Sequence, residues 1–298
     1  MSRDTSALTV MKRRAFLQTV GALSAGAALG VPRASAARRL ASSAGHAKLS
    51  RFGLELYSVR KAMRADPERT LAAVRAAGYS DVELLWSFDN FGRTTQQVRS
   101  SLAAEGLKAP SAHISPATLT ADWSRSLDTA TQLGHSYLIV PDLPAASEAT
   151  LDGWRSWADK FNTAGAAARK AGIWLAFHNE PNHMKPIDGQ VPYDLFVSLL
   201  DPAVVRLQFD CGNLTMGGAD AMTYFARYRD RYFSFHIKDV VADRSHDTEL
   251  GKGIVSIGAL LAAVPELDQK PVYVEQEAPA DELASAQQNA AYLQKLRF

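Results

Sequence analysis

The chain has 298 residues, 47% of them hydrophobic and 21% charged, so it can bury a sizeable core and is not a disordered or low-complexity protein. The formal net charge of +2 is misleading, because residues 1–36 carry five bases and one acid, which leaves 28 bases against 30 acids, a net of −2, in the remainder. We therefore expect no nucleic-acid partner.

The first 36 residues have the pattern of an export signal. Arg13 and Arg14 form a twin-arginine pair before the moderately apolar stretch 15–31, and Ala34-Ser35-Ala36 is a small-x-small cleavage site. An uncleaved anchor is the alternative, but the stretch is short and poor in Leu and Ile for a stable membrane anchor. We expect a signal peptide over 1–36, the twin-arginine export machinery as partner, and a periplasmic or secreted protein.

Residues 37–50 are rich in Ala and Ser and are expected to form a flexible lead-in to one folded domain over 51–298. In this domain short apolar runs alternate with amphipathic helical stretches. Strands are predicted at residues 52–58, 81–85, 108–114, 136–140, 173–179, 204–210, 232–238 and 271–276. Helices are predicted at residues 66–77, 94–104, a segment ending at Gly134, 151–171, 193–200, 219–228, 257–264 and 282–296.

A glycine stands between helix and strand in each of the first four joins, where a left-handed residue ends the helix. These glycines are Gly78, Gly106, Gly134 and Gly172. Eight strands and eight helices over roughly 240 residues predict an α/β fold, a (β/α)8 TIM barrel in a single domain. An open doubly wound sheet is the alternative, but no G-x-G-x-x-G motif follows the first strand.

Polar side chains end nearly every predicted strand, and in a barrel these carboxyl ends share the face that carries the active site. The side chains expected there are Glu55, Tyr57, Glu83, His113, His178, Glu180, Asp210, His236, Lys238, Glu275 and Glu277. Among them His178, Asp210, His236 and Glu275 offer two imidazoles and two carboxylates. This mixed set suits one divalent metal ion such as Mn²⁺, Zn²⁺, Co²⁺ or Mg²⁺.

Five motifs follow one another along the domain in a familiar order and spacing. They are Phe177-His178-Asn179-Glu180, Phe209-Asp210-Cys211-Gly212, His236-Ile237-Lys238-Asp239, Gly251-Lys252-Gly253 and Val274-Glu275-Gln276-Glu277. With these motifs, residues 53–298 resemble the xylose isomerase-like TIM barrel family of sugar phosphate isomerases/epimerases, in particular its exported branch with a twin-arginine signal.

The resemblance implies one divalent ion held by a Glu, Asp, His, Glu set. The last three members fall on Asp210, His236 and Glu275, and the first falls on His178. Many relatives have E-N-H where this chain has H-N-E, so Glu180 is an alternative first ligand and His183 in the adjoining loop is a further one.

The resemblance and the group types predict a metal-dependent sugar isomerase or epimerase that forms an enediolate by proton abstraction next to a carbonyl. Glu180 and Glu275 are expected to transfer the proton, and Lys238 to polarise a substrate oxygen. The residues expected to bind or shape the pocket for a small-molecule sugar substrate are Tyr57, Glu83, His113 and Glu277.

The stretch Gly251-Lys252-Gly253 is expected to form a flexible loop over the site. In a sugar-phosphate enzyme such a loop would cradle phosphate. No other phosphate-binding motif is visible, and phosphorylated sugars are scarce outside the cytoplasm, so an unphosphorylated or oxidised sugar is expected.

Two further functions remain open. The same metal and base could drive β-elimination, as in a dehydratase, or in a lyase acting on a keto sugar or 3-keto glycoside. The H-N-E departure also motivates a non-catalytic sugar-binding barrel. Apurinic-site endonucleases share the barrel, but they need a trinuclear cluster with more His, Asp and Glu ligands than are visible here.

Overall fold

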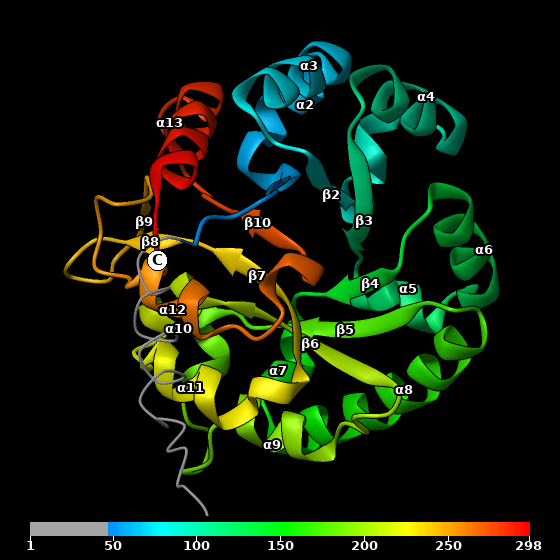
Figure 1. Cartoon of the computed structure of the whole chain (residues 1–298). Helices are drawn as coiled ribbons and strands as arrows, with labels where there is room; N and C mark the ends of the chain where they lie inside the picture. The colour runs from blue at the N-terminus through cyan, green and yellow to red at the C-terminus, as the bar shows by residue number, and fades with distance from the viewer. Residues whose placement is uncertain (1–46) are drawn as a thin grey trace, which may run out of the picture. The chain divides into compact units, whose positions relative to one another are not determined.

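The computed structural model describes residues 47–298, so the predicted signal peptide and most of the predicted lead-in lie outside the described residues. Eight parallel strands close into a barrel in the order β1-β10-β7-β6-β5-β4-β3-β2, and the helices surround it (Figure 1). The predicted (β/α)8 barrel in a single domain is therefore confirmed.

The elements follow the predicted alternation of strands and helices. The barrel strands are β1 (Gly53–Glu55), β2 (Asp81–Leu85), β3 (Lys108–His113), β4 (Tyr137–Val140), β5 (Trp174–His178), β6 (Val205–Asp210), β7 (Tyr232–Ile237) and β10 (Val272–Val274). The longer helices are α3 (Pro67–Ala77), α4 (Thr95–Glu105), α6 (Trp123–Leu133), α8 (Leu151–Lys170), α9 (Pro192–Leu199), α11 (Ala221–Tyr228), α12 (Ile257–Ala263) and α13 (Glu282–Lys295). The other helical segments are η1 (Leu56–Val59), α2 (Arg60–Ala65), η2 (Trp86–Gly92), α5 (Pro116–Thr120), α7 (Ala145–Glu148), η3 (Pro181–Met184), α10 (Cys211–Met216), η4 (Arg229–Arg231) and η5 (Leu267–Gln269).

The helix ends are set by the local sequence. Helix α3 begins because the Asp66 carboxylate accepts a hydrogen bond from the Arg69 N–H and Pro67 occupies the first helical position. The four glycines expected to end helices, Gly78, Gly106, Gly134 and Gly172, all have φ between 64° and 108°. This is the left-handed region that those ends require.

Three segments differ from the predicted elements. The first strand ends at Glu55 rather than at residue 58, because the η1 turn follows it. Helix α10 starts directly after β6, because Asp210 Oδ1 accepts a hydrogen bond from the Asn213 N–H at 2.7 Å and so caps it. After β7, the strands β8 (Asp239–Val240) and β9 (Asp247–Thr248) pair as a small antiparallel sheet.

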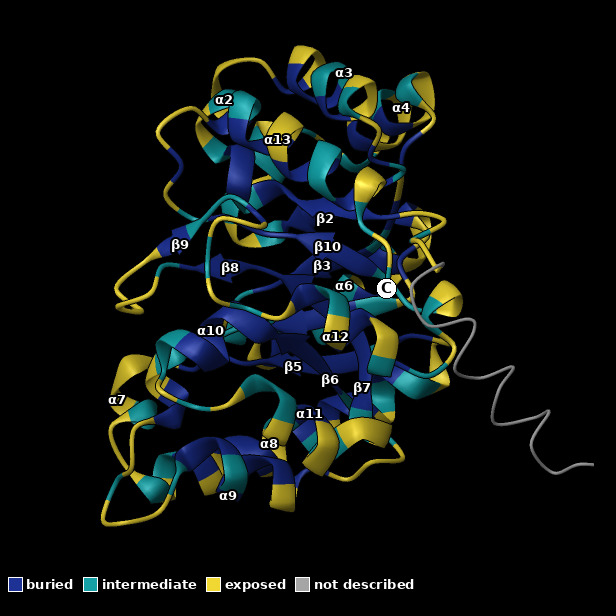
Figure 2. Cartoon of the chain, turned by 60° about the vertical axis from the view of Figure 1, so that its left-hand side comes forward, coloured by how far each residue is buried: buried dark blue, intermediate teal, exposed yellow. Residues whose placement is uncertain are grey.

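The barrel strands are buried on both faces, as parallel strands covered by helices must be. Every residue of β2, β7 and β10 is buried, and exposed residues lie mainly on the outer sides of the helices and in loops (Figure 2). Within residues 47–298, no helix combines the length and apolar character needed to span a membrane.

The amino-terminal end of the barrel interior is filled by aromatic side chains. Tyr137 at the start of β4 stacks on Phe233 near the start of β7, with ring centroids 3.8 Å apart. Ile139 and Ala176 pack against Phe233. This apolar plug places the polar residues of the interior toward the carboxyl ends of the strands.

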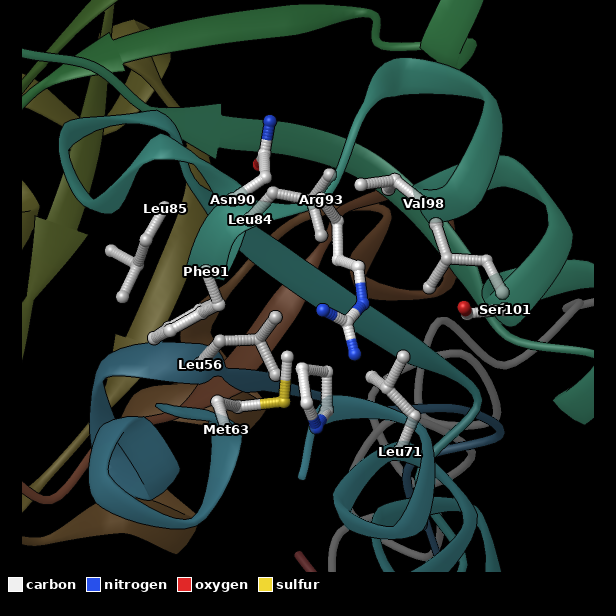
Figure 3. A pocket seen from close by; sticks show the side chains of 12 residues that line it. Leu56, Met63, Leu71, Leu84, Leu85, Asn90, Phe91, Arg93, Val98 and Ser101 are labelled. Atoms are coloured by element: carbon white, nitrogen blue, oxygen red, sulfur yellow. The ribbon is translucent and has the colours of Figure 1, made fainter. Parts of the chain in front are cut away.

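A small apolar cavity lies outside the barrel, between β2 and the helices α2, α3 and α4. Leu56, Met63 and Phe91 are among the side chains that line it (Figure 3). Its volume of about 20 Å³ has room for a single water molecule. The cavity is therefore a packing gap and not a sugar site.

One buried histidine lies away from the strand tips. His135 precedes β4, and its Nδ1 lies 2.6 Å from the carbonyl oxygen of Ala109, to which it donates. Its Nε2 is buried without a hydrogen-bond partner. Burial lowers the pKa of His135 to about 4, because an imidazolium would expose an unpaired N–H to the apolar interior.

We predict that His135 makes the protein less stable in mild acid. The unfolded chain protonates this imidazole near pH 6.5 and the folded chain only near pH 4. The contribution of neutral His135 to the free energy of unfolding is therefore fully present above pH 6.5 and is lost as the pH falls from 6.5 toward 4. The free energy of unfolding should fall by about 2 kcal/mol between pH 7 and pH 5. Urea unfolding of wild type and His135→Asn at both pH values would show their free-energy difference shrinking at pH 5. The same difference at both pH values would contradict the assignment.

Candidate metal and catalytic site

The register of the barrel brings distant strand tips together. Asp210 pairs with His236 across β6 and β7, and β10 places Glu275 next to the same tips. His178, Asp210, His236 and Glu275 each contribute one nitrogen or oxygen atom to a group whose members lie within 4.8 Å of one another. All four residues are buried. The structure thus gathers the four side chains named from the sequence as metal ligands.

The atoms of this cluster face one another at distances that an ion could bridge. Asp210 Oδ2 lies 3.8 Å from His178 Nε2 and 3.9 Å from His236 Nδ1, and His236 Nδ1 lies 3.0 Å from Glu275 Oε2. Asp210 Oδ2 is buried and accepts no hydrogen bond, although the Lys238 ammonium lies 3.2 Å away. A buried carboxylate oxygen with free lone pairs is a feature that a bound cation would explain.

Lys238 lies inside the cluster and not in open space. Its Nζ lies 3.2 Å from Asp210, 3.0 Å from Glu275 and 2.5 Å from Glu277, and donates to Asn213 Oδ1 at 2.8 Å. Burial alone would lower the pKa of Lys238, but the surrounding carboxylates outweigh it and hold that pKa well above its usual value. The side chain is fully buried, so its charge is balanced by the carboxylates of the cluster.

Gly212 makes room for this lysine. A Cβ atom at position 212 would lie 2.6 Å from the Cβ and Cγ atoms of Lys238. The glycine after Asp210-Cys211 is therefore required by the close approach of α10 to β7.

His236 is held between two carboxylates. Its Nδ1 faces Glu275 at 3.0 Å and its Nε2 faces Glu83 at 2.5 Å. Burial acts to lower the pKa of His236, but these carboxylates raise it to about 10. Glu83 also accepts hydrogen bonds from Ser111 and Gln208. Glu83, expected from the sequence to bind substrate or shape its pocket, lies fully buried beneath the cluster and contacts His236.

A cavity of about 570 Å³ opens beside the cluster. Its aromatic side includes Tyr57, Phe88 and His113. Its acidic side is formed by Asp142, Glu148, Glu180, Glu275 and Glu277. Among the described lining residues there are five carboxylates and no Lys or Arg. Four of the residues expected from the sequence to touch substrate, Tyr57, His113, Glu180 and Glu277, are in this lining, together with Glu275.

The two carboxylates expected to transfer protons have opposite tendencies. Burial raises the pKa of Glu180 well above its usual value, although 28% of its side chain is exposed. Burial also acts to raise the pKa of Glu275, but the cations Lys238 and His236 outweigh it and hold that pKa well below its usual range. Two carboxyl groups whose pKa values are shifted in opposite directions therefore share one cavity, which is the arrangement of a general acid and a general base.

His183, considered from the sequence as a further ligand, faces away from the cluster. Its Nδ1 accepts a hydrogen bond from the Glu180 N–H at 3.0 Å, and its Nε2 lies 3.0 Å from Glu148 Oε1. The ring stacks on Phe177. Both nitrogens are thus used in shaping the loop after β5, and His183 is not a ligand candidate.

Sequence reasoning missed four residues of this region. Asp142 and Glu148 follow β4, whose last residue is apolar and is followed by Pro141, so no polar strand tip marked them. Gln208 stands two residues before Asp210, and the alternation of a strand places both on the same face. Asn213 lies in the first turn of α10. Gln208 and Asn213 were missed because their neutral amides carry no charge that would mark them as site residues.

The Gly251-Lys252-Gly253 segment is not a flexible loop over the site, so that prediction is wrong. The Asp239 carboxylate accepts hydrogen bonds from four backbone N–H groups, those of Val240, Gly251, Gly253 and Val255, at 2.8–3.0 Å. A Cβ atom at position 253 would collide with this carboxylate. These N–H groups already bind an anion of the protein itself and do not form a cradle for phosphate.

Comparison with known proteins agrees with this fold. A model of the family described as xylose isomerase-like TIM barrel matches residues 71–296. The inosose dehydratase of Lacticaseibacillus casei is 34% identical over 105 residues, which are 34% of this chain and 34% of that enzyme. The chain thus matches about a third of the length of this curated relative.

Solved structures show the same barrel. A sugar phosphate isomerase/epimerase from Parabacteroides distasonis ATCC 8503 superposes with a TM-score of 0.72 at 24% identity, over 83% of this chain and 98% of that chain. The IolI protein with a bound zinc atom has a TM-score of 0.60 at 12% identity, over 81% of this chain and 96% of that chain.

We predict that Asp239→Asn loosens the segment 251–255. An amide cannot accept all four backbone hydrogen bonds, so the free energy of unfolding should fall by about 1–3 kcal/mol. Hydrogen exchange should become faster at the amides of Gly251, Gly253 and Val255. Asp243→Asn, in the neighbouring exposed turn, is the matched control and should leave these amides unchanged. Equal exchange in wild type and Asp239→Asn would contradict the anchoring role.

Proposed function

Because the chain belongs to the xylose isomerase-like TIM barrel family, we propose that it is a metal-dependent sugar isomerase or epimerase. The proposed reaction begins with removal of the proton next to a carbonyl group of an unphosphorylated sugar. One observation carries this proposal: Glu180 and Glu275 line the same cavity, beside four residues able to hold a divalent ion.

The proposed ion would be held by His178, Asp210, His236 and Glu275, and its binding would require loss of the proton that His236 Nδ1 shares with Glu275. Two imidazole nitrogens and two carboxylate oxygens are a donor set for Zn²⁺, Mn²⁺ or Co²⁺, and the free lone pairs of Asp210 Oδ2 support it. The zinc atom in the similar IolI structure also supports a divalent ion in this fold. When bound, the ion would polarise a substrate carbonyl and stabilise negative charge on its oxygen.

Proton transfer would fall to the two cavity carboxylates. Glu275 contacts His236 and Lys238 through Oε2, so Oε1 can face the substrate and remove its proton. Glu180, whose pKa is raised by burial, would return a proton to the other face or to the neighbouring carbon. Lys238 would balance the charge of Asp210 and Glu275 throughout, and its polarisation of a substrate oxygen stays a prediction.

The electrostatics of the cavity support an uncharged substrate. The lining has five acidic side chains and no Lys or Arg among its described residues, which disfavours a phosphate or carboxylate group on the substrate. The Tyr57 ring, packed against the Arg60 guanidinium at 4.0 Å, offers a flat surface for a sugar ring. The proposed export to the periplasm or beyond, based on Arg13 and Arg14, agrees with an unphosphorylated sugar.

The second candidate is a dehydratase or lyase, and the inosose dehydratase relatives favour it. Proton abstraction by Glu275 is the same first step, after which a protonated Glu180 would donate its proton to a departing hydroxyl or alkoxy group. Elimination lowers the mass of the sugar by water or an aglycone, whereas isomerisation leaves the mass unchanged.

We predict about one divalent ion per chain after incubation of the purified protein with Zn²⁺ and removal of the excess. Asp210→Asn and His236→Gln should each lower the affinity at least 10-fold, because each removes a ligand atom. Asp142→Asn, in the same cavity but outside the cluster, is the control and should bind zinc as wild type does. The zinc content per chain would be measured by elemental mass spectrometry. Zinc content as high as that of wild type in both Asp210→Asn and His236→Gln would refute the assignment of these ligands.

We predict deuterium incorporation when neutral keto sugars are incubated with the enzyme in D₂O. Glu180→Gln and Glu275→Gln should lower the rate by about 10²–10⁴, and the phosphorylated form of an accepted sugar should react more slowly. Product mass separates isomerisation from elimination. If the protein binds no metal and no keto sugar exchanges its proton, the result would favour the non-catalytic sugar-binding barrel.

A further inference from the structure

We infer that Gln208 is a positioning residue that fixes the tautomer of His178 and thereby makes His178 Nε2, and not Glu180, the first ligand of the proposed ion. The inference rests on the proposed function for the presence of the ion. The tautomer itself follows from hydrogen bonds in the barrel interior, which exist whether or not an ion binds.

Gln208 is fully buried in β6 and all its hydrogen-bonding capacity is used. Its Nε2 lies 3.1 Å from both carboxylate oxygens of Glu83 and 3.0 Å from Ser234 Oγ. Its Oε1 lies 2.8 Å from His113 Nε2 and 2.9 Å from His178 Nδ1. One amide therefore joins the base of the cluster to two imidazoles.

The chemistry of the partners fixes which way this amide points. The shape of a glutamine side chain does not distinguish its oxygen from its nitrogen. Glu83, which already accepts hydrogen bonds from Ser111 and His236, can only accept when ionised, so the NH₂ group of Gln208 must face it. The amide oxygen then faces both imidazoles and can only accept, which requires an N–H on His113 Nε2 and on His178 Nδ1.

The contacts of a second amide agree with this tautomer. Lys238 can only donate, so the Asn213 oxygen must face its Nζ at 2.8 Å. The Asn213 NH₂ group is then directed toward the Asn179 carbonyl oxygen at 3.1 Å, Glu180 Oε2 at 3.1 Å and His178 Nε2 at 3.3 Å. A nitrogen that can only donate thus lies near His178 Nε2, which agrees with a lone pair on this ring nitrogen.

His178 is therefore a neutral imidazole whose lone pair points into the cluster. Nε2 lies 3.8 Å from Asp210 Oδ2, and a metal-binding histidine that donates its other N–H to a fixed acceptor is held in the correct tautomer for binding. Glu180 is tied to Asn213 and partly exposed in the cavity. Glu180 is therefore free to contact the substrate. The two ends of the H-N-E motif thus have separate roles, with His178 toward the ion and Glu180 toward the substrate.

Two measurements test this inference. In metal-free protein labelled with ¹⁵N-histidine, long-range ¹H–¹⁵N correlation spectra should show His178 protonated at Nδ1 and not at Nε2, with His178→Gln used to assign the signal. Gln208→Met keeps the volume and removes all the hydrogen bonds. It should lower Co²⁺ affinity about 10–100-fold and leave His178 as a mixture of tautomers.

Ser234→Ala is the matched control, because it removes another hydrogen bond of the same amide without touching His178. It should retain the Co²⁺ affinity and the tautomer of wild type. A wild-type His178 protonated at Nε2 would overturn the inference, even if Gln208→Met failed to fold. Unchanged Co²⁺ affinity in folded Gln208→Met would also overturn it. Loss of Co²⁺ binding in wild type itself would instead contradict the proposed function.

Discussion

The site depends on the register of parallel strands in a closed barrel. Pairing of Asp210 with His236 and of His178 with Gln208 across neighbouring strands places polar side chains from distant parts of the sequence at one end of the interior. The apolar plug, which includes Tyr137 and Phe233, fills the opposite end of the interior. The polar and apolar side chains of the interior are thus separated along the barrel axis. A shift of one residue in any of these strands would turn its polar side chain from the interior toward the surrounding helices.

Burial of so many ionisable groups is tolerable only because they compensate one another. Glu83, Asp210 and Glu275 are buried together with the cations Lys238 and His236. An isolated charge in this interior would cost several kcal/mol, so each cation stabilises the carboxylates beside it. This explains why Lys238 points into the cluster and not into the cavity. It also makes the cluster a preorganised set of charges, which is the property an active site needs.

The sequence predicted the barrel and the convergence of its strand tips because both leave strong local signals. Apolar runs, helix-ending glycines and acidic or imidazole groups such as Asp210 and His236 can be recognised without coordinates. The contacts of neutral amides cannot, since Gln208 and Asn213 carry no charge pattern and their partners come from distant strands. The role of Asp239 was missed for a related reason: its four partners are backbone N–H groups, whose positions depend on the folded loop.

Anomalous X-ray diffraction from crystals grown with Zn²⁺ tests the central claim most directly. We predict one peak at about 2.0–2.2 Å from His178 Nε2, His236 Nδ1 and the carboxylates of Asp210 and Glu275. A peak coordinated by Glu180 without His178, or the absence of any peak among these four side chains, would contradict it.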